Sequence, residues 1–417
     1  MTFIRDRQFH KFSAYGFLKN LRFFEPFIIL YFREAGFSFL DIGILFAIRE
    51  IATVLLEVPT GLVADICGRK ISMIFSMAAY IVSFLTFFFF PSYAAAAGAM
   101  ILFACGEAFR TGTHKAMILE YLRITGQEEW KPDYYGATRA ASKLGSALNA
   151  LIAATLVFIS GSFRYVFLAA AFPCLINIIN LASYPHALNG TDVRKKHVRP
   201  GIKDTLKHFA SIFRNHDARL SIINSAVFDS FFKVTKEYLQ PVLKAMAIGL
   251  PILTALTVDR RTAIVIGLVY FVLFLSASTA SRYSGKFSRR ISGVVQSINI
   301  IWIIGFSMLI IAGVFQDISV YVVTIGAYLV LFILQNLRRP LCVTYISDKV
   351  PHRVMASGLS VESLIKTLAM AILAPACGYL ADLAGVGITV AAAGVLMGFL
   401  YLPLRLRKSG QESASAL

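Results

Sequence analysis

The chain of 417 residues contains few charged residues, since Asp, Glu, Lys and Arg together make up only 15% of it. Hydrophobic residues make up 57%, and phenylalanine alone occurs 35 times. A water-soluble protein of this length could not bury so much apolar surface. The composition therefore excludes a soluble globular protein and predicts an integral membrane protein.

The sequence also lacks the groups from which catalytic and metal sites are built. Its 5 cysteines form no Cys-x-x-Cys pair, and its 7 histidines show no ligand spacing. No Ser/His/Asp set and no nucleotide-binding loop is present, so nothing indicates ATP as an energy source. No sizeable domain outside the membrane favours a receptor. We therefore expect no metal, no cofactor and no enzymatic activity.

Acidic residues are scarce relative to basic ones, and the formal net charge is +18. If the N-terminus lies inside the cell, the cytoplasmic segments hold far more Lys and Arg than the outer loops, as the positive-inside rule requires. The basic cluster Arg194–Arg199 is then expected to contact anionic lipid rather than nucleic acid. This distribution predicts a multi-pass protein of the inner (cytoplasmic) membrane with both termini cytoplasmic.

Long apolar runs recur along the whole chain. A membrane-spanning helix needs about 20 apolar residues. Twelve segments of that kind are predicted: 12–32, 40–64, 71–91, 95–119, 136–159, 165–186, 219–246, 262–281, 291–314, 318–346, 355–381 and 386–404. The predicted fold class is an all-α membrane protein with twelve transmembrane helices in two six-helix bundles.

One long polar stretch divides these segments into two halves. It predicts an N-terminal bundle over 1–186, a basic cytoplasmic linker over 187–218, and a C-terminal bundle over 219–417 with a short cytoplasmic tail. Within the linker, apolar residues at helical spacing predict a short amphipathic helix on the inner membrane surface. These residues are Ile202, Leu206, Phe209 and Phe213.

The two halves read as parallel repeats. Predicted helix 1 contains Glu25-Pro26 and helix 7 contains Gln240-Pro241, while helix 4 contains Glu107-Ala108-Phe109-Arg110 and helix 10 contains Gln335-Asn336-Leu337-Arg338. Glu120 and Asp348 follow at matching places. The common order of these matches supports the six-plus-six architecture.

Charged residues nevertheless fall inside the predicted spans. Each costs at least about 2.5–3.5 kcal/mol at the bilayer centre, so they must face one another or a watery cavity. Arg22 and Glu25 share a helix face at i, i+3, as do Glu107 and Arg110. These charges predict a pathway for a solute, although each ion pair can also serve only to neutralise itself.

A short charged turn joins the second and third predicted helices. Its sequence is Glu57-Val-Pro-Thr-Gly-Leu-Val-Ala-Asp-Ile-Cys-Gly-Arg-Lys70. The pattern Gly-x-x-x-Asp-x-x-Gly-Arg-Lys resembles the loop signature of the major facilitator superfamily. The longer pattern, with Glu57 and Pro59, is similar to the variant found in one group of tetracycline efflux pumps. Residues 281–290 resemble a worn copy of this loop, with Gly285 where the aspartate should be.

This resemblance implies that helices 1, 4, 7 and 10 line a central cavity. The residues it implies for solute binding and proton coupling are Arg22, Glu25, Glu107, Arg110, Asp229, Lys233, Gln335 and Arg338. The residues it implies for a conformational gate are Glu57, Gly61, Asp65, Gly68, Arg69, Lys70, Glu120 and Arg139. The implied partners are a small-molecule substrate, protons and membrane lipids, for a protein that acts as a monomer.

Two functions stay open at this point. One is a proton-coupled secondary transporter of a small polar or charged solute, working by alternating access. The other is proton-driven efflux of drugs of the tetracycline type, which the turn after helix 2 favours. Against efflux, helix 5 reads Gly145-Ser-Ala-Leu-Asn-Ala-Leu-Ile152 and lacks the Gly-Pro-x-x-Gly-Gly pattern of such antiporters.

Overall fold

The computed structural model describes residues 4–189, 215–251, 254–291, 293–349 and 355–407. Within these residues all the regular structure is helical. Most of the predicted basic linker lies outside the described residues, and so does the predicted amphipathic helix with Ile202, Leu206, Phe209 and Phe213.

The helices fall into the predicted segments. Up to the linker they are α1 (Arg7–Lys19), α2 (Ile28–Glu34), α3 (Phe39–Cys67), α4 (Arg69–Phe89), α5 (Tyr93–Arg110), α6 (Thr113–Ile124), η1 (Glu128–Trp130), α7 (Lys131–Ser160), α8 (Tyr165–Ala182) and η2 (His186–Asn189). Beyond it they are α10 (His216–Thr235), η3 (Lys236–Tyr238), α11 (Leu239–Gly249), α12 (Val258–Arg290), α13 (Val294–Asp317), α14 (Tyr321–Lys349), α15 (Met355–Ala384) and α16 (Val386–Leu404). In the described part of the chain, 8 helices are long and apolar enough to cross a membrane. The all-α membrane fold is confirmed, and the number of twelve spans stays a prediction.

Three predicted segments are interrupted rather than continuous. Segment 12–32 breaks between α1 and α2, where Pro26 has no N–H to donate to a helical bond. Segment 95–119 breaks at Gly112, whose φ of 76° is left-handed and favours glycine. Segment 219–246 tightens into η3 between α10 and α11. The first two of these segments carry Arg22, Glu25, Glu107 and Arg110, and the third carries Asp229 and Lys233. The breaks therefore place charged side chains near irregular backbone.

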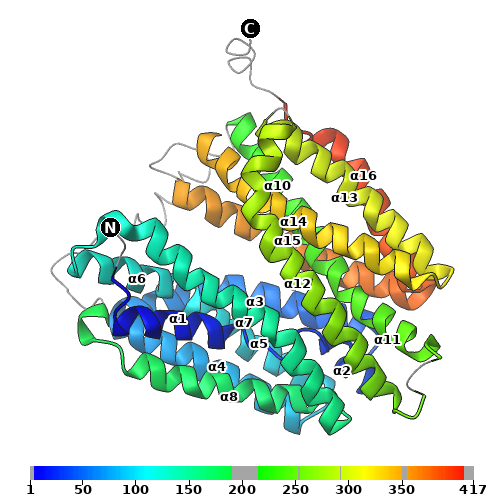
Figure 1. Cartoon of the computed structure of the whole chain (residues 1–417), viewed down its shortest axis with the longest axis horizontal. Coiled ribbons are helices and arrows are strands. Elements are labelled where there is room, and N and C mark those ends of the chain that lie inside the picture. The colour runs from blue at the N-terminus through cyan, green and yellow to red at the C-terminus, as the bar shows by residue number, and fades with distance from the viewer. Residues whose placement is uncertain (1–3, 190–214, 252–253, 292, 350–354, 408–417) are drawn as a thin grey trace. The chain divides into compact units, whose positions relative to one another are not determined.

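The described residues form two compact units. The first comprises Met1–Ser38, Ile44–Lys195 and Leu243–Phe271, as far as these residues are described. In it, α4 packs against α5 and α8, and α1 packs against α7 and α8 (Figure 1). Aromatic rings fill its interior, where Phe24 contacts Phe84, Phe103 and Phe167 at centroid distances of 5.1, 5.8 and 5.6 Å. Each such ring removes a large apolar area from its surroundings and fixes the packing of these helices.

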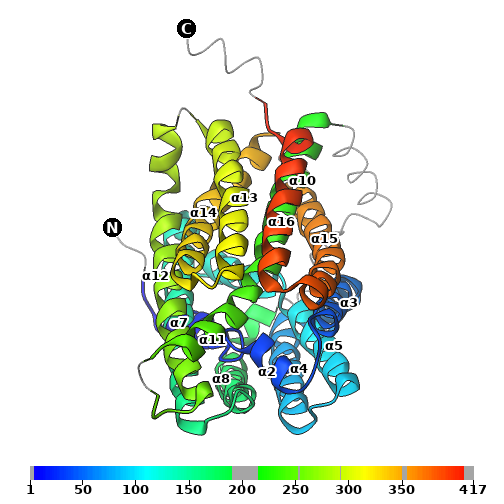
Figure 2. The same ribbon diagram turned by 90° about the vertical axis from the view of Figure 1, so that its right-hand side faces the viewer.

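The second unit comprises Phe39–Gly43, Lys196–Val242 and Val272–Leu417, as far as these residues are described. In it, α13 packs against α14 and α16, and α10 packs against α14 and α15 (Figure 2). Glycine allows α13 and α16 to approach closely, since a Cβ at Gly313 would lie 2.4 Å from the backbone of Gly387. The indole of Trp302 is buried there and donates to the carbonyl of Met397 at 3.0 Å.

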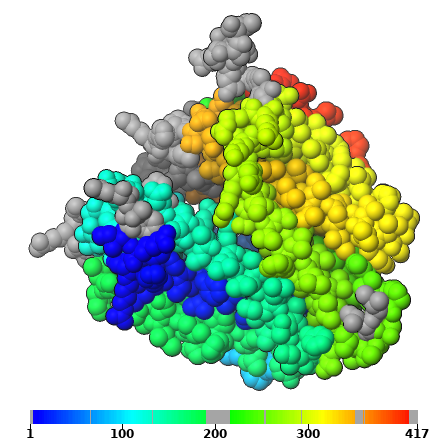
Figure 3. Space-filling model, in the orientation of Figure 1, coloured from blue at the N-terminus to red at the C-terminus, as the bar shows by residue number. Residues whose placement is uncertain are grey.

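The start of the chain is held against the first unit. In Figure 3 the first residues of α1, in dark blue, lie at the surface beside the cyan residues of α6. The Tyr121 hydroxyl donates to the Asp6 carboxylate, and the Ile4 N–H donates to the Gln127 side chain at 3.3 Å. Asp6 also caps α1 by accepting from the Phe9 N–H at 2.8 Å. These bonds fix the position of α1, which carries Tyr15 and Lys19.

Candidate functional site

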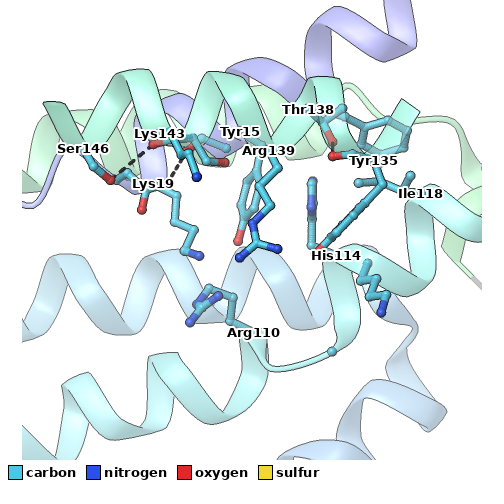
Figure 4. Close-up of a pocket in the computed structure, with 16 residues that line it drawn as sticks. Tyr15, Lys19, Arg110, His114, Ile118, Tyr135, Thr138, Arg139, Lys143 and Ser146 are labelled. Carbon is cyan, nitrogen blue, oxygen red and sulfur yellow. Dashed lines mark hydrogen bonds between the residues drawn. The ribbon is translucent and has the colours of Figure 1, made fainter. Parts of the chain in front are cut away.

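A pocket of about 500 Å³ lies within the first unit, between α1, α5, α6 and α7. Its most prominent feature is positive charge. The cationic side chains that line it are Lys19, Arg110, Lys115, Arg139 and Lys143. Figure 4 shows Lys19 and Arg139 pointing toward Arg110 across one open space. None of the lining residues that the structure describes is acidic.

The helices account for this gathering of cations. Arg110 is the last residue of α5, and Lys19 is the last of α1, so both side chains extend from helix ends. Arg139 and Lys143 stand at i, i+4 on α7 and therefore share one face. A Cβ at Gly16 would lie 2.4 Å from the Ser142 hydroxyl, so glycine permits the close approach of α1 and α7 at the pocket wall.

Aromatic rings form the other wall. Tyr15 stacks on His114 with centroids 4.0 Å apart and an interplanar angle of 25°. Phe12 meets the edge of His114 at 5.5 Å. The Tyr15 hydroxyl and the His114 Nε2 are buried and have no hydrogen-bond partner among the described residues. The pocket thus offers a flat aromatic surface and two unused polar atoms beside its cations.

An ion network borders the pocket at Arg110. The carboxylate of Glu107 accepts from Arg22 on one oxygen and from Arg110 on the other. The Tyr80 hydroxyl donates to the same carboxylate at 2.7 Å, and Arg110 Nε lies 3.3 Å from the Tyr80 oxygen. Charge-assisted bonds of this kind hold all four side chains in place.

Glu25 extends this network. It lies 3.4 Å from Arg22, and 42% of its side chain is exposed, compared with 19% for Glu107. Arg22 also lies over the rings of Tyr80 and Phe103 at 5.7 and 5.3 Å. The structure therefore brings together Arg22, Glu25, Glu107 and Arg110, the predicted cavity residues of the first half.

The predicted cavity residues of the second half lie in the second unit. Asp229 accepts from Gln335 at 2.8 Å and from Arg339 at 3.3 Å, and its side chain is 4% exposed. Lys233 lies in the last turn of α10, one turn beyond Asp229. Arg339, which pairs with Asp229 here, was not among the predicted site residues.

Arg338 points into the interior of that unit. It is 1% exposed, and its Nη2 donates to the Asn224 carbonyl at 3.0 Å and to the Asn224 side chain. Its guanidinium lies over the rings of Phe228 and Trp302 at 4.2 and 5.3 Å. This environment supports the packing of α14 on α10 and α13, and the structure does not bring Arg338 into contact with Asp229.

Three of the predicted gate residues, Gly68, Arg69 and Lys70, lie at the turn between α3 and α4. Gly68 is the single residue between the two helices, and its φ of 92° favours glycine. The Asn189 side chain accepts from the Lys70 N–H at 3.1 Å, and Lys70 Nζ donates to the Tyr184 carbonyl at 3.0 Å. This turn is therefore tied to the chain segment that follows α8.

The other predicted gate residues lie at several places. Glu57, Gly61 and Asp65 belong to α3. Glu120 on α6 pairs with Arg123, one turn further along. Arg139 lies at the pocket described above and not at the turn.

Several pocket residues escaped the sequence analysis as members of a binding site. Lys19, Lys143 and His114 were not among the predicted site residues. The i, i+4 spacing of Arg139 and Lys143 was the one available signal. The stacking of Tyr15 on His114 joins residues about 100 positions apart, which no local pattern reveals.

An all-helical membrane fold with a polar, charged pocket among broken helices defines a solute transporter rather than an enzyme. The family model of the Major Facilitator Superfamily matches residues 15–372. The chain belongs to this superfamily of membrane transporters.

Similar proteins agree with this assignment. The uncharacterized MFS-type transporter YxaM of Bacillus subtilis (strain 168) is 34% identical over 125 residues, which cover 29% of this chain and only 30% of that protein. The crystal structure of the nucleoside transporter NupG superimposes with a TM-score of 0.78 at 13% identity and covers 97% of this chain and all of that one (100%). A POT family transporter in complex with 5-aminolevulinic acid gives a TM-score of 0.70 at 13% identity, over 95% of both chains. At such identities these structures establish the fold alone.

Proposed function

We propose that this transporter moves a small polar or charged solute across the cytoplasmic membrane by alternating access, in exchange for or together with protons. The observation that carries the proposal is the network of Arg22, Glu25, Glu107 and Arg110 at the edge of the pocket. Buried acids next to bases can change protonation when their surroundings change. The pocket supplies the solute site, and the network supplies proton carriers beside it.

Glu25 and Glu107 have different places in this proposal. Glu107 is held by two guanidinium groups and a phenol, so its charged form is well stabilised. Glu25 has Arg22 at 3.4 Å and a more exposed carboxylate. A proton that binds to Glu25 would weaken its hold on Arg22, and Arg22 contacts Glu107 directly. Glu25 is therefore the first candidate for the proton carrier.

The test uses purified protein in proteoliposomes with a pH-sensitive dye inside. The solute is one selected by thermal shift from a panel of metabolites and drugs. We expect Glu25→Gln to uncouple transport from the pH gradient while solute exchange continues. Glu34→Gln, at the end of α2, is the control and should behave as wild type. If Glu25→Gln and Glu107→Gln both accumulate solute with unchanged pH dependence, neither carries the proton, and Asp229 becomes the next candidate.

Drug efflux is the second candidate function. The sequence pattern of the turn between α3 and α4, with Glu57, Pro59 and Asp65, favours it. In the same thermal-shift panel, stabilisation by lipophilic cationic drugs and not by metabolites would select efflux over solute uptake.

The proposal places both termini and the linker in the cytoplasm, with the basic linker near anionic lipid, for a protein that acts as a monomer. A cysteine at Thr191 probes this topology, because residues 187–218 contain no native cysteine. An impermeant thiol reagent added outside intact cells should leave Thr191→Cys at the labelling level of the parent protein. Ser92→Cys, in the exposed turn before α5, is the matched variant that should be labelled. Labelling of Thr191→Cys from outside would overturn the proposed topology.

A further inference from the structure

We infer that the pocket of the first unit binds an organic anion, whose carboxylate or phosphate group lies between Lys19, Arg110 and Arg139 while its apolar part faces Tyr15 and His114. This inference names the substrate class for the proposed transport function and rests on it. Three observations carry it: the charge of the pocket, its unused polar atoms, and its size.

The positive charge of the pocket is not neutralised by acidic residues in the described part of its own lining. Among its five cations, Arg110 has Glu107 as a carboxylate partner and shares it with Arg22. In the described part of the chain neither Lys19 nor Arg139 forms an ion pair, and no acidic side chain lines the pocket. Cations held together in a membrane domain repel one another and lose hydration, so an anion that enters gains from both effects.

The unused polar atoms lie at the aromatic wall. Tyr15 is 2% exposed, and its hydroxyl has no hydrogen-bond partner among the described residues. Nε2 of the stacked His114 is also without a partner. Buried polar groups are usually hydrogen-bonded, so two adjacent unpaired groups in one pocket wall are available to a ligand. They would hydrogen-bond to the solute while the cations bind its charged group. Figure 4 shows Tyr15 and His114 among the side chains that line the same pocket as these cations.

The size of the pocket excludes a simple inorganic ion as its best occupant. About 500 Å³ lies within the range of sites for small organic molecules, roughly 300–1,000 Å³. The stacked faces of Tyr15 and His114 and the ring of Phe12 suit a planar or apolar body. Lipophilic cations would meet the like charges of Lys19, Arg110 and Arg139, so the pocket disfavours them.

The test measures binding to the purified full-length protein by calorimetry and by thermal unfolding. The probes are benzoate, phenyl phosphate, neutral benzamide and cationic benzylamine, each up to about 10 mM, which would saturate a site with a Kd near 1 mM. We expect at least one of the two anions to bind, with an affinity that falls as salt increases, and the neutral and cationic probes not to bind. Benzoate alone would indicate a carboxylate substrate, and phenyl phosphate alone a phosphate substrate.

Variants locate the binding. Lys19→Gln and Arg139→Gln should each weaken binding of the anion about tenfold or more, because each removes a charge-assisted bond. Lys19→Arg should keep most of the affinity. Lys131→Gln is the matched control, since Lys131 also lies on α7 but pairs with the exposed Glu128 at 2.7 Å. It should bind the anion as wild type does.

Three results would overturn the inference: benzamide or benzylamine binding as tightly as the anions, neither anion binding at all, or unchanged anion binding by the Lys19→Gln/Arg139→Gln double variant. Failure of the inference can be told from failure of the proposed function, because binding in detergent needs no gradient. Proton-driven transport of a cationic drug would refute the anion site and leave proton-coupled transport standing. Anion binding without any coupling to protons would refute proton-coupled transport and leave the anion site standing.

Discussion

The two units place corresponding sequence positions in different surroundings. In the first, Glu107 and Arg110 pair along α5, and Arg110 reaches the pocket. In the second, the matching positions on α14 hold Gln335 and Arg338. Gln335 carries no charge and donates to Asp229 instead, so Arg338 finds its partners in Asn224 and two aromatic rings. The carboxylate of Glu107 is thus replaced by the amide of Gln335 in the second unit. The arginine that follows lines a pocket in the first unit, as Arg110, and is buried in the second, as Arg338.

A second pair of matching positions differs in the sign of its charge. Glu25-Pro26 corresponds to Gln240-Pro241, which places Glu237 where the first half has Arg22. Gln240 donates to Glu237 at 2.9 Å, and Lys236 lies 3.1 Å from the same carboxylate. The repeat therefore preserves the polar contact and not the charge. We conclude that the sign of the charge at this position belongs to each unit and not to the repeat.

The largest effect on stability is expected at Glu107. Glu107→Ala leaves Arg22 and Arg110 without their shared carboxylate, and breaking a buried ion pair costs about 3–5 kcal/mol. The thermal unfolding midpoint in detergent should fall accordingly. The matched variant Gln335→Ala removes one hydrogen bond and leaves Asp229 with Arg339, so about 1–2 kcal/mol is expected. Equal losses of unfolding free energy in the two variants would show that Glu107 contributes no more to stability than Gln335 does.

A somewhat smaller loss is expected at Arg338. Arg338→Ala removes a buried side chain from two rings and from Asn224, which should cost about 2–4 kcal/mol through lost packing and an unpaired carbonyl. Arg338→Lys should restore little, because an ammonium lacks the planar group that stacks on Phe228 and Trp302. The comparison is Arg339→Ala, whose side chain is 56% exposed but whose loss removes one partner of the buried Asp229 carboxylate and leaves it with Gln335, so about 1–2 kcal/mol is expected. If Arg339→Ala proved the more damaging, Arg338 would not be the structural arginine.

The sequence alone predicted the membrane class, the family and the place of most helices, because these depend on composition and on runs of about 20 apolar residues. It also predicted that Arg22 and Glu25 lie together, and likewise Glu107 and Arg110, since i, i+3 spacing places two side chains on one helix face. The family resemblance implied only that Arg22 and Glu107 face one cavity, and their direct contact was not predicted. It joins residues 85 positions apart in the chain.

Other features depend on tertiary structure and left no local signal. Arg338 and Arg339 are neighbours, and adjacent residues on a helix point about 100° apart, so the sequence could not show which of them meets Asp229. The breaks at Pro26 and Gly112 were not predicted, because both residues lie within otherwise apolar runs and are tolerated in membrane helices. The pocket was not predicted, since its walls come from four helices.

The smallest effect on stability, with a large effect on transport, is expected at the turn between α3 and α4. The chain changes helix at Gly68, so Arg69 begins α4, where the positive end of the helix dipole disfavours a cation. Residues 281–290, which resemble this turn in sequence, belong to α12, which continues to Arg290. Arg289 lies in the last turn of that helix, where a cation is favoured. The same pair of basic residues thus stands at opposite ends of a helix in the two units. The basic residue Arg69 is therefore explained by its place in the turn between α3 and α4, and not by a gain in helix stability.

Arg69→Ala should therefore change the free energy of unfolding by no more than about 0.5 kcal/mol. The rate of solute transport should fall, because we propose that the turn acts in the conformational change. Asp65→Asn is expected to lower the transport rate in the same way. Arg289→Ala is the matched control: it should lose about 0.3–1 kcal/mol of helix stability and transport at close to the wild-type rate. Uptake into proteoliposomes, measured beside thermal unfolding, separates the two effects. If Arg69→Ala transports at the wild-type rate, or if Arg289→Ala is equally impaired, the turn after α3 has no gating role that its copy lacks.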